Sequence, residues 1–239
     1  MDLAFYRPYF TETYLMGPNS LRLLKELLGR NTRPFNEGSL ILDLGCGKGL
    51  TSYALCRETG AHVLANDLWI SGEENAARFA AWGVGEFIAP VHENADNLSF
   101  DKGSFDAIVS IDSYHYFAGT PGYFQRKILP FLKPGGVALI GVPGIKEEYD
   151  ERTEELLSPW LAEEAYMFKS VRQWKNLLGE GPDMAFVDVF ELNCFDAAWK
   201  DWLATDNQYA KGDSLHWVSR IQPYTNFVGM IVRKKDDGI

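Results

Sequence analysis

The chain has 239 residues, of which 46% are hydrophobic and 23% charged, and this composition excludes a disordered or fibrous protein. Its net charge of −10 repels phosphate backbones and disfavours nucleic acid as a partner. No stretch approaches the roughly 18 uninterrupted apolar residues of a membrane span, and the first residues do not resemble a secretory signal, so we expect no membrane span and a cytoplasmic location.

Apolar runs and helical patterns alternate along the first 142 residues. Leucines at helical spacing over 11–28, interrupted by Gly17-Pro18, predict two short helices ahead of the core. Compact apolar runs predict strands at 39–44, 61–66, 86–91, 105–111 and 136–142, with helices at 50–58, 72–82 and 122–132 between them. This alternation predicts an α/β fold with a doubly wound, mostly parallel sheet.

The pattern changes after the fifth predicted strand. Residues 145–180 are charged and helical in character, which favours a helical cover inserted there. Two β-rich runs, 185–192 and 226–233, predict the last strands and flank a segment that contains Trp199, Trp202 and Trp217. Because no repeat or low-complexity linker is visible, we expect one domain over 1–239, made of a helical cap (1–38), a core (39–142), the cover (145–180) and the final strands with intervening helices (183–233).

No metal or disulfide pattern occurs in the sequence. The three cysteines, Cys46, Cys56 and Cys194, are odd in number and lack Cys-x-x-Cys spacing. The four histidines fall in no ligand pattern such as His-Glu-x-x-His. The sequence therefore predicts no metal site and no disulfide framework.

A glycine-rich turn, Asp43-Leu44-Gly45-Cys46-Gly47-Lys48-Gly49, joins the first predicted strand to a helix. Glycines allow the backbone to approach a ligand closely, and the free amides at the helix start face that ligand. The G-x-G-x-G spacing differs from the G-x-G-x-x-G of dinucleotide-binding turns, and Asp43 would repel a pyrophosphate but suits an ammonium group. The turn therefore indicates a ligand that carries an amine.

Polar residues also follow the next two predicted strands. Asp67 ends the second strand, where a carboxylate can accept hydrogen bonds from both hydroxyls of a ribose. Asn94-Ala95-Asp96-Asn97 follows the third, where a carboxylate and an amide suit the amino group and ring nitrogen of adenine. With the glycine turn, these residues predict a site for an adenosine that carries an amine but no phosphate.

The motifs ILDLGCGKG, ANDLW, ENADNL, FDAIVSIDSYHYF and LKPGG follow one another between residues 39 and 142. In order and spacing they resemble the motifs of class I S-adenosylmethionine (SAM) dependent methyltransferases, and are most similar to the small-molecule branch of ubiquinone/menaquinone-type and sarcosine- or phosphoethanolamine-type enzymes. The resemblance implies a Rossmann-like sheet of seven strands with the last one antiparallel. It also implies methyl transfer from SAM to N, O, S or activated C of a small-molecule acceptor, with S-adenosylhomocysteine (SAH) as product.

Carried over by position, the resemblance implies a set of cofactor-binding residues. Asp43, Gly45 and Gly47 would line the methionine end with Cys46 between them, Asp67 would hold the ribose, and Leu68, Trp69, Ala95, Asp96 and Asn97 would surround the adenine. Ile111 and Asp112 would border the transferring methyl group. The family has no common pattern for 1–38 or 145–222, the segments that choose the substrate.

Methyl transfer from a sulfonium is an in-line displacement, so the protein supplies alignment, desolvation and sometimes a base. Asp112 and His115 are the candidate bases, with Tyr114 as a hydrogen-bonding neighbour, because this segment leaves the sheet where open α/β folds bind ligands. His115 has the alternative role of capping its loop. Aromatic residues of the cap and cover, such as Trp160 and Phe168, either wall a pocket for a planar or cationic acceptor or simply pack.

Two other functions are open at this point. An NAD-dependent oxidoreductase shares the strand–helix–strand unit and the ribose acid, but it should show G-x-G-x-x-G. A non-catalytic module that retains SAM or SAH would carry the same motifs as an enzyme. The sequence has no signature for the acceptor atom or for the oligomeric state.

Overall fold

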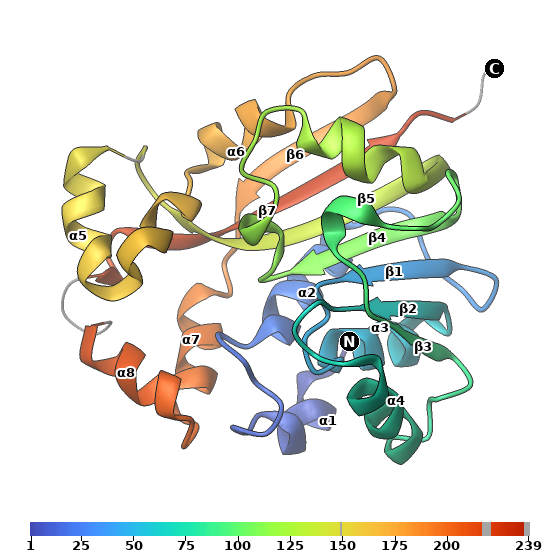
Figure 1. Cartoon of the computed structure of the whole chain (residues 1–239), viewed down its shortest axis with the longest axis horizontal. Coiled ribbons are helices and arrows are strands. Elements are labelled where there is room, and N and C mark those ends of the chain that lie inside the picture. Colours follow the sequence, from blue (N-terminus) through green and yellow to red (C-terminus); the bar gives the residue numbers. More distant parts are fainter. Residues whose placement is uncertain (149, 217–220, 237–239) are drawn as a thin grey trace.

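The computed structural model describes residues 1–148, 150–216 and 221–236. Within them the strands form one seven-stranded sheet of order β3-β2-β1-β4-β5-β7-β6 (Figure 1). The strands are β1 (Leu40–Leu44), β2 (His62–Asn66), β3 (Ile88–Val91), β4 (Phe105–Ile111), β5 (Leu132–Ile145), β6 (Met184–Glu191) and β7 (Thr225–Lys234). Strands β1 to β5 pair in parallel, and β7 is antiparallel to both β5 and β6. The predicted sheet with an antiparallel last strand is confirmed.

Helices cover both faces of this sheet (Figure 1). They are α1 (Leu3–Tyr6), α2 (Ser20–Arg30), α3 (Leu50–Thr59), α4 (Gly72–Ala81), α5 (Glu151–Leu161), α6 (Val171–Leu178), α7 (Phe195–Leu203) and α8 (Gln208–His216). Buried side chains of α2, α3 and α7 belong to one core cluster, and those of α6 and the 124–131 segment belong to a second cluster.

Side chains along the central strands point alternately to two covered faces, which explains why the predicted strands are mostly apolar. On β4, Val109 belongs to the first core cluster and its neighbour Ile108 to the second, and both are buried. Successive side chains of a strand point to opposite faces, so a strand that is covered on both sides has no solvent-facing position. Each such side chain contributes about 1.5–3 kcal/mol of apolar burial.

One helix prediction is wrong, and a second is correct in place but differs in helix type. Only a turn forms over residues 11–18, and α2 begins at Ser20, where the Asn19 side chain accepts a hydrogen bond from the Leu21 amide (3.1 Å). Gly17-Pro18 interrupts the chain in this segment, and the early helix is α1 instead, capped by Asp2. The helix predicted over 122–132 is a π-helical turn followed by a 3-10 turn that contains Pro130, whose missing N–H cannot extend a helix.

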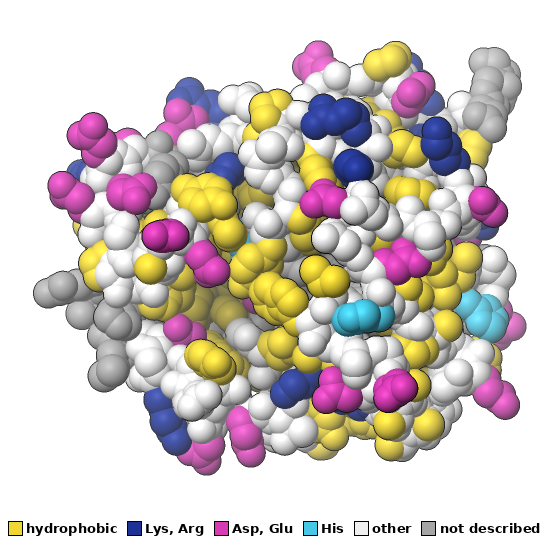
Figure 2. Space-filling view, viewed as in Figure 1, with side chains coloured by type: hydrophobic (Ala, Val, Ile, Leu, Met, Phe, Trp, Pro, Cys, Tyr) yellow, Lys and Arg dark blue, Asp and Glu magenta, His cyan; other side chains and the backbone are white. Residues whose placement is uncertain are grey.

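The segment from 145 to 180 contains the end of β5, then α5, a 3-10 helix at Ala162–Met167, and α6. Helix α6 packs on β6, with Trp174 and Leu178 in the second core cluster. Helix α5 contacts α8, because the indole N–H of Trp160 donates to the Asp213 carboxylate (2.8 Å). The predicted Trp217 lies outside the described residues. The space-filling view shows a hollow walled by hydrophobic side chains between this part of the molecule and the carboxyl ends of the central strands (Figure 2).

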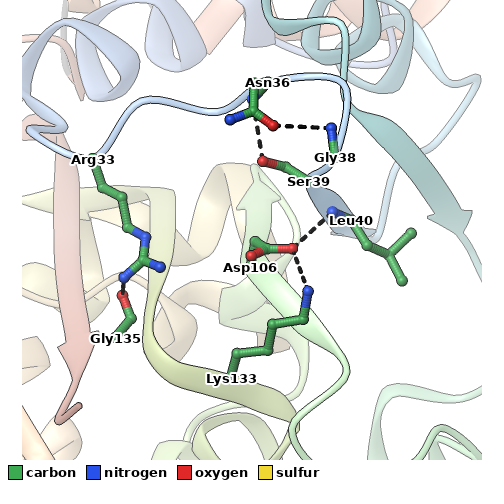
Figure 3. Close-up of polar contacts among 8 residues, drawn as sticks. All are labelled: Arg33, Asn36, Gly38, Ser39, Leu40, Asp106, Lys133 and Gly135. Atoms are coloured by element: carbon green, nitrogen blue, oxygen red, sulfur yellow. Dashed lines mark hydrogen bonds and ion pairs between the residues drawn. The ribbon is translucent and has the colours of Figure 1, made fainter.

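A polar network ties the opposite, amino ends of the strands together (Figure 3). The Asp106 carboxylate accepts hydrogen bonds from the Leu40 amide (2.9 Å) and from Lys133 Nζ (2.7 Å). Beside it, Arg33 donates to the Gly135 carbonyl, which holds the segment before β1 against the start of β5. Asp106 thereby links the first residues of β1, β4 and β5.

Asp106→Ala is expected to lower the free energy of unfolding by about 1–3 kcal/mol at neutral pH, because the Leu40 amide and the Lys133 ammonium lose a charged acceptor. Burial raises the pKa of Asp106, but the bonds from Lys133 and Leu40 outweigh it, so the pKa lies below its ordinary value. The stabilisation is therefore present above the unfolded pKa and is lost as pH falls through the folded one. Urea unfolding at about pH 7 and about pH 3 checks this, with the exposed Asp101→Ala as control. Equal stabilities of the two variants at neutral pH would contradict it.

Candidate functional site

A cavity of about 450 Å³ lies at the carboxyl ends of β1, β2 and β4. Open α/β sheets bind their ligands at this edge, where the loops after the strands meet. Lining residues come from five stretches of the chain, within 14–20, 44–51, 66–69, 93–96 and 111–117.

The glycine turn forms one wall of the cavity. Gly45, Gly47 and Gly49 all have left-handed backbone, with φ of 77°, 54° and 77°. A Cβ on Gly45 would overlap the Ser113 side chain, and one on Gly49 would overlap the ring of Phe79. Glycine is required there both for its conformation and for the close approach of neighbouring segments.

Asp67 lies at the cavity wall with its carboxylate fixed by backbone amides. One oxygen accepts from Gly47 N (2.7 Å), and the other accepts from Trp69 N (2.8 Å) and Ile70 N (2.9 Å). The side chain is buried apart from the surface that it presents to the cavity. This arrangement joins the second strand to the glycine turn and holds a negative acceptor in one place before any ligand arrives.

Asp43 lies beneath the turn and outside the residues that line the cavity. Its Oδ2 accepts from the hydroxyls of Thr51 and Ser52, both at 2.6 Å. Burial raises the pKa of Asp43 to about 6, although these two hydrogen bonds lower it. Its other oxygen, Oδ1, is buried and has no hydrogen-bond partner among the described residues. Asp43 therefore braces the start of α3 against β1 from below.

Most of the side chains expected around an adenine line the cavity, but one does not. Leu68 and Trp69 line the cavity and are half or more exposed, at 50% and 66%. Ala95 and Asp96 also line it, whereas Asn97 does not. Glu93 and Asn94 line it as well; the sequence reasoning missed Glu93, although the motif ENADNL contains it.

Asp112 and Ile111 border the cavity where β4 ends. Asp112 has a φ of 57°, a left-handed conformation that is uncommon for a residue with a side chain and is found where a site is tightly constrained. Its carboxylate has no hydrogen-bond donor among the described residues. Burial, and secondarily the negative charge of Asp213, raise the pKa of Asp112 to about 7.

His115 and Tyr114 lie behind the cavity wall. Tyr114 packs among aromatic rings of the second core cluster, and burial raises its pKa. His115 is buried, and its Nδ1 has no partner in the part of the chain that the structure describes. Burial, and secondarily the charge of Lys169, lower the pKa of His115 to about 3, so the ring is neutral at physiological pH. Of the three predicted catalytic side chains, only Asp112 reaches the cavity.

The segment 14–18 forms a further wall that the motifs did not reveal. Gly17 lies against Asp112, because a Cβ at Gly17 would sit 3.0 Å from Asp112 Oδ2. The Lys48 ammonium donates to the Thr13 carbonyl (2.6 Å) and ties the same segment to the glycine turn. The Gly17-Pro18 pair was the local signal, but it indicated only a break between helices.

Asp112→Asn is expected to stabilise the protein at about pH 8 and to do so much less at about pH 4. Folded Asp112 keeps its proton to about pH 7, whereas the unfolded residue loses it near 3.8, so its contribution to stability falls as pH rises between these values. Asparagine does not titrate and tolerates left-handed backbone, so only a small, pH-independent gain should remain in acid. Thermal unfolding should show a rise of about 2–8 °C at the higher pH. A rise in unfolding temperature that is the same at both pH values would contradict the raised pKa of Asp112.

The sequence around this cavity matches a known domain. Residues 41–136 match the family model of the methyltransferase domain. The segment is a methyltransferase domain. It contains the glycine turn, Asp67, Asp96 and Asp112, and therefore most of the cavity wall.

Curated relatives of this chain are identical to it at about a third of the aligned residues. The sterol 24-C-methyltransferase of Eremothecium gossypii is 31% identical over 122 residues, which are 50% of this chain and 32% of the relative. The ubiquinone biosynthesis O-methyltransferase of Caulobacter vibrioides is 32% identical over 139 residues, 55% of this chain and 54% of the relative. The chain thus spans about a third to a half of the length of these relatives.

Solved structures share the fold over a larger part of the chain. Phosphoethanolamine N-methyltransferase 2 of Haemonchus contortus superposes with a TM-score of 0.70 at 21% identity, over 93% of this chain and 54% of that one. Geranyl diphosphate C-methyltransferase of Streptomyces coelicolor A3(2) superposes with a TM-score of 0.70 at 16% identity, over 90% of this chain and 78% of that one. The likeness therefore extends beyond the methyltransferase domain to the cap and the last strands.

Among the described residues, no helix has both the length and the apolar character to cross a membrane. Nor do the described His, Cys, Asp and Glu side chains gather into a group of three or more that could hold a metal ion.

Proposed function

We propose that the protein transfers a methyl group from SAM to a small-molecule acceptor and releases SAH. The observation that carries this proposal is the geometry of Asp67, a carboxylate held by three backbone amides at the wall of the cavity. A fixed double acceptor at the end of a second strand suits the two hydroxyls of a ribose. The methyltransferase domain match over 41–136 supports the same reading.

The cavity fits an adenosine that carries a methionine-like chain. Beside Asp67, the absence of a Cβ at Gly45 and Gly47 lets other segments approach the turn: a Cβ on Gly45 would overlap the Ser113 side chain, and one on Gly47 would lie 2.9 Å from Met16 Sδ. Leu68 and Trp69 offer apolar surface for a base, and Asp96 offers an acceptor for its amino group. SAM supplies an electrophilic methyl group on a sulfonium; the residues that bind it also align that methyl and exclude water from it.

Asp112 is the residue of this chain that we propose holds the acceptor. It lies next to Ile111 at the end of β4, inside the cavity, and its raised pKa makes it a better base than an exposed carboxylate. His115 and Tyr114 would shape this segment from behind through packing. The cap and the cover would complete the acceptor pocket within one domain.

The three cysteines are free, which supports a reducing compartment and so a cytoplasmic location as part of this proposal.

Parallel isothermal titrations with SAM, SAH and NAD test the proposal. We expect SAM and SAH to bind and NAD to give no heat of binding. Binding of NAD alone would overturn the proposed cofactor and favour an oxidoreductase. SAM binding without release of SAH on a broad acceptor panel would favour a non-catalytic module that retains the ligand.

A further inference from the structure

The charge of the cavity wall selects for cations. Four carboxylates line it, from Asp67, Glu93, Asp96 and Asp112, and Lys48 is the one lysine or arginine among the described lining residues. That ammonium is bound to the Thr13 carbonyl. A wall with this balance repels phosphate and carboxylate groups and attracts ammonium groups.

Two of the four carboxylates are already engaged by donors. Asp67 accepts three backbone N–H groups, and Glu93 accepts from the amide and the hydroxyl of Ser99. Asp96 is exposed to solvent, and the Tyr123 hydroxyl donates to the Ala95 carbonyl (3.2 Å). Asp112 has no donor in the described part of the chain and is more deeply placed than Asp96, and such a carboxylate is costly unless a donor meets it. A ligand group with N–H donors would satisfy it.

One aromatic ring, that of Tyr116, lies near this carboxylate. Tyr116 is close enough to Asp112 for the charge of that carboxylate to raise the pKa of the phenol, after burial, which is the larger cause. The ring of Trp69 meets that of Tyr116 edge to face with centroids 5.0 Å apart, and both line the cavity. Ring faces attract cations, so the ring of Tyr116 and the carboxylate offer complementary surfaces to one ammonium group.

A second carboxylate, on α8, strengthens the negative field at Asp112. Asp213 of α8 accepts from the indole N–H of Trp160 on α5 (2.8 Å) and of Trp202 on α7 (2.7 Å). Two neutral donors hold this charge in place without neutralising it, and its repulsion contributes to the raised pKa of Asp112. A cation bound at Asp112 would relieve that repulsion.

We infer that the methyl acceptor is an amine, which binds as its ammonium ion against Asp112 and the ring of Tyr116. This inference rests on the proposed function. The ammonium gives one proton to the Asp112 carboxylate, and the freed nitrogen lone pair forms the N–C bond as the C–S bond breaks, its electron pair staying on sulfur. The products are SAH and the methylated ammonium ion, and the proton on Asp112 passes to solvent when they leave.

Binding of amines to the SAH-loaded protein tests the inference. The probes are butylamine, N-methylbenzylamine and phenethylamine, each paired with the alcohol or ether of the same shape, in phosphate buffer so that no buffer amine competes. We expect the amines to bind at least about tenfold more tightly than their neutral partners, because a charge-assisted hydrogen bond is lost in the partner. Mass spectrometry with SAM should then detect N-methylated product.

Two variants test whether Asp112 causes the preference for amines. Asp112→Asn should remove the preference for amines while leaving the affinity for SAH unchanged, and Asp101→Asn, an exposed control of equal charge, should change neither. Neutral partners that bind as tightly as the amines, or a preference that survives Asp112→Asn, would overturn the inference. If SAH itself does not bind, the proposed function fails; if SAH binds and no amine does, only the amine inference fails.

Discussion

Asp67→Ala is expected to weaken SAM binding by about 10- to 150-fold, which corresponds to about 1.5–3 kcal/mol for charge-assisted hydrogen bonds to a ribose. The loss includes an indirect part, because the carboxylate also accepts from the Gly47 amide and so shapes the glycine turn. Isothermal titration with SAM and with SAH measures both contributions together. An unchanged affinity in a folded variant would refute the assignment of Asp67.

Two controls separate charge from shape in this experiment. Asp67→Asn keeps one oxygen that can accept from Trp69 and Ile70, but it turns an amide group toward the Gly47 N–H or the ligand. We therefore expect its affinity to lie between those of the native protein and Asp67→Ala. Asp101→Ala removes an equal charge from an exposed loop and should leave the affinity unchanged.

Gly45→Ala is expected to lower the free energy of unfolding by about 2–5 kcal/mol and to abolish SAM binding in whatever protein remains folded. Two costs combine: a φ of 77° that alanine adopts poorly, and overlap of the new methyl group with the Ser113 side chain. Moving Ser113 has its own cost, because its hydroxyl donates to the Leu44 carbonyl (2.8 Å). Urea unfolding gives the stability and titration gives the affinity.

The matched control is Gly29→Ala in α2, where nothing lies within 4 Å of the new methyl group. That variant should be as stable as the native protein or more stable by about 0.5–1 kcal/mol, since glycine is a poor helix former. Combining Gly45→Ala with Ser113→Gly should recover the part of the loss due to overlap but not the part due to backbone conformation. Native stability of the single Gly45→Ala variant would contradict the strained turn.

The local patterns of the sequence determined the sheet and the glycine turn. Strand β4 is covered on both faces, so it is apolar apart from Asp106 and Ser110 and can be recognised without any structure. The glycine turn is equally local, because left-handed backbone at Gly45, Gly47 and Gly49 requires the residue type itself. Asp67 was recognisable for a similar reason, as an acid at the place where a predicted strand ends.

Only the tertiary structure decided which side chains face the cavity. In the sequence, Asp112, Tyr114 and His115 are near neighbours in one motif, but the 3-10 turn over Tyr114–Tyr116 directs two of them into the protein and leaves Asp112 at the cavity. Such a short turn has no period from which side-chain direction can be read. In the same way, Asp43 suited an ammonium group by its position, yet β1 directs it to Thr51 and Ser52 beneath the turn.

The acceptor side depends on segments that are distant in the chain. Gly17 meets Asp112, and Asp213 adds its charge from α8, although nothing in the sequence near any of the three indicates the others. A turn or a strand is specified by neighbouring residues, so the sequence by itself determined the fold and the glycine turn. The cavity wall that we propose meets the acceptor is assembled by packing between remote elements, and only the folded chain brings those residues within reach of one another.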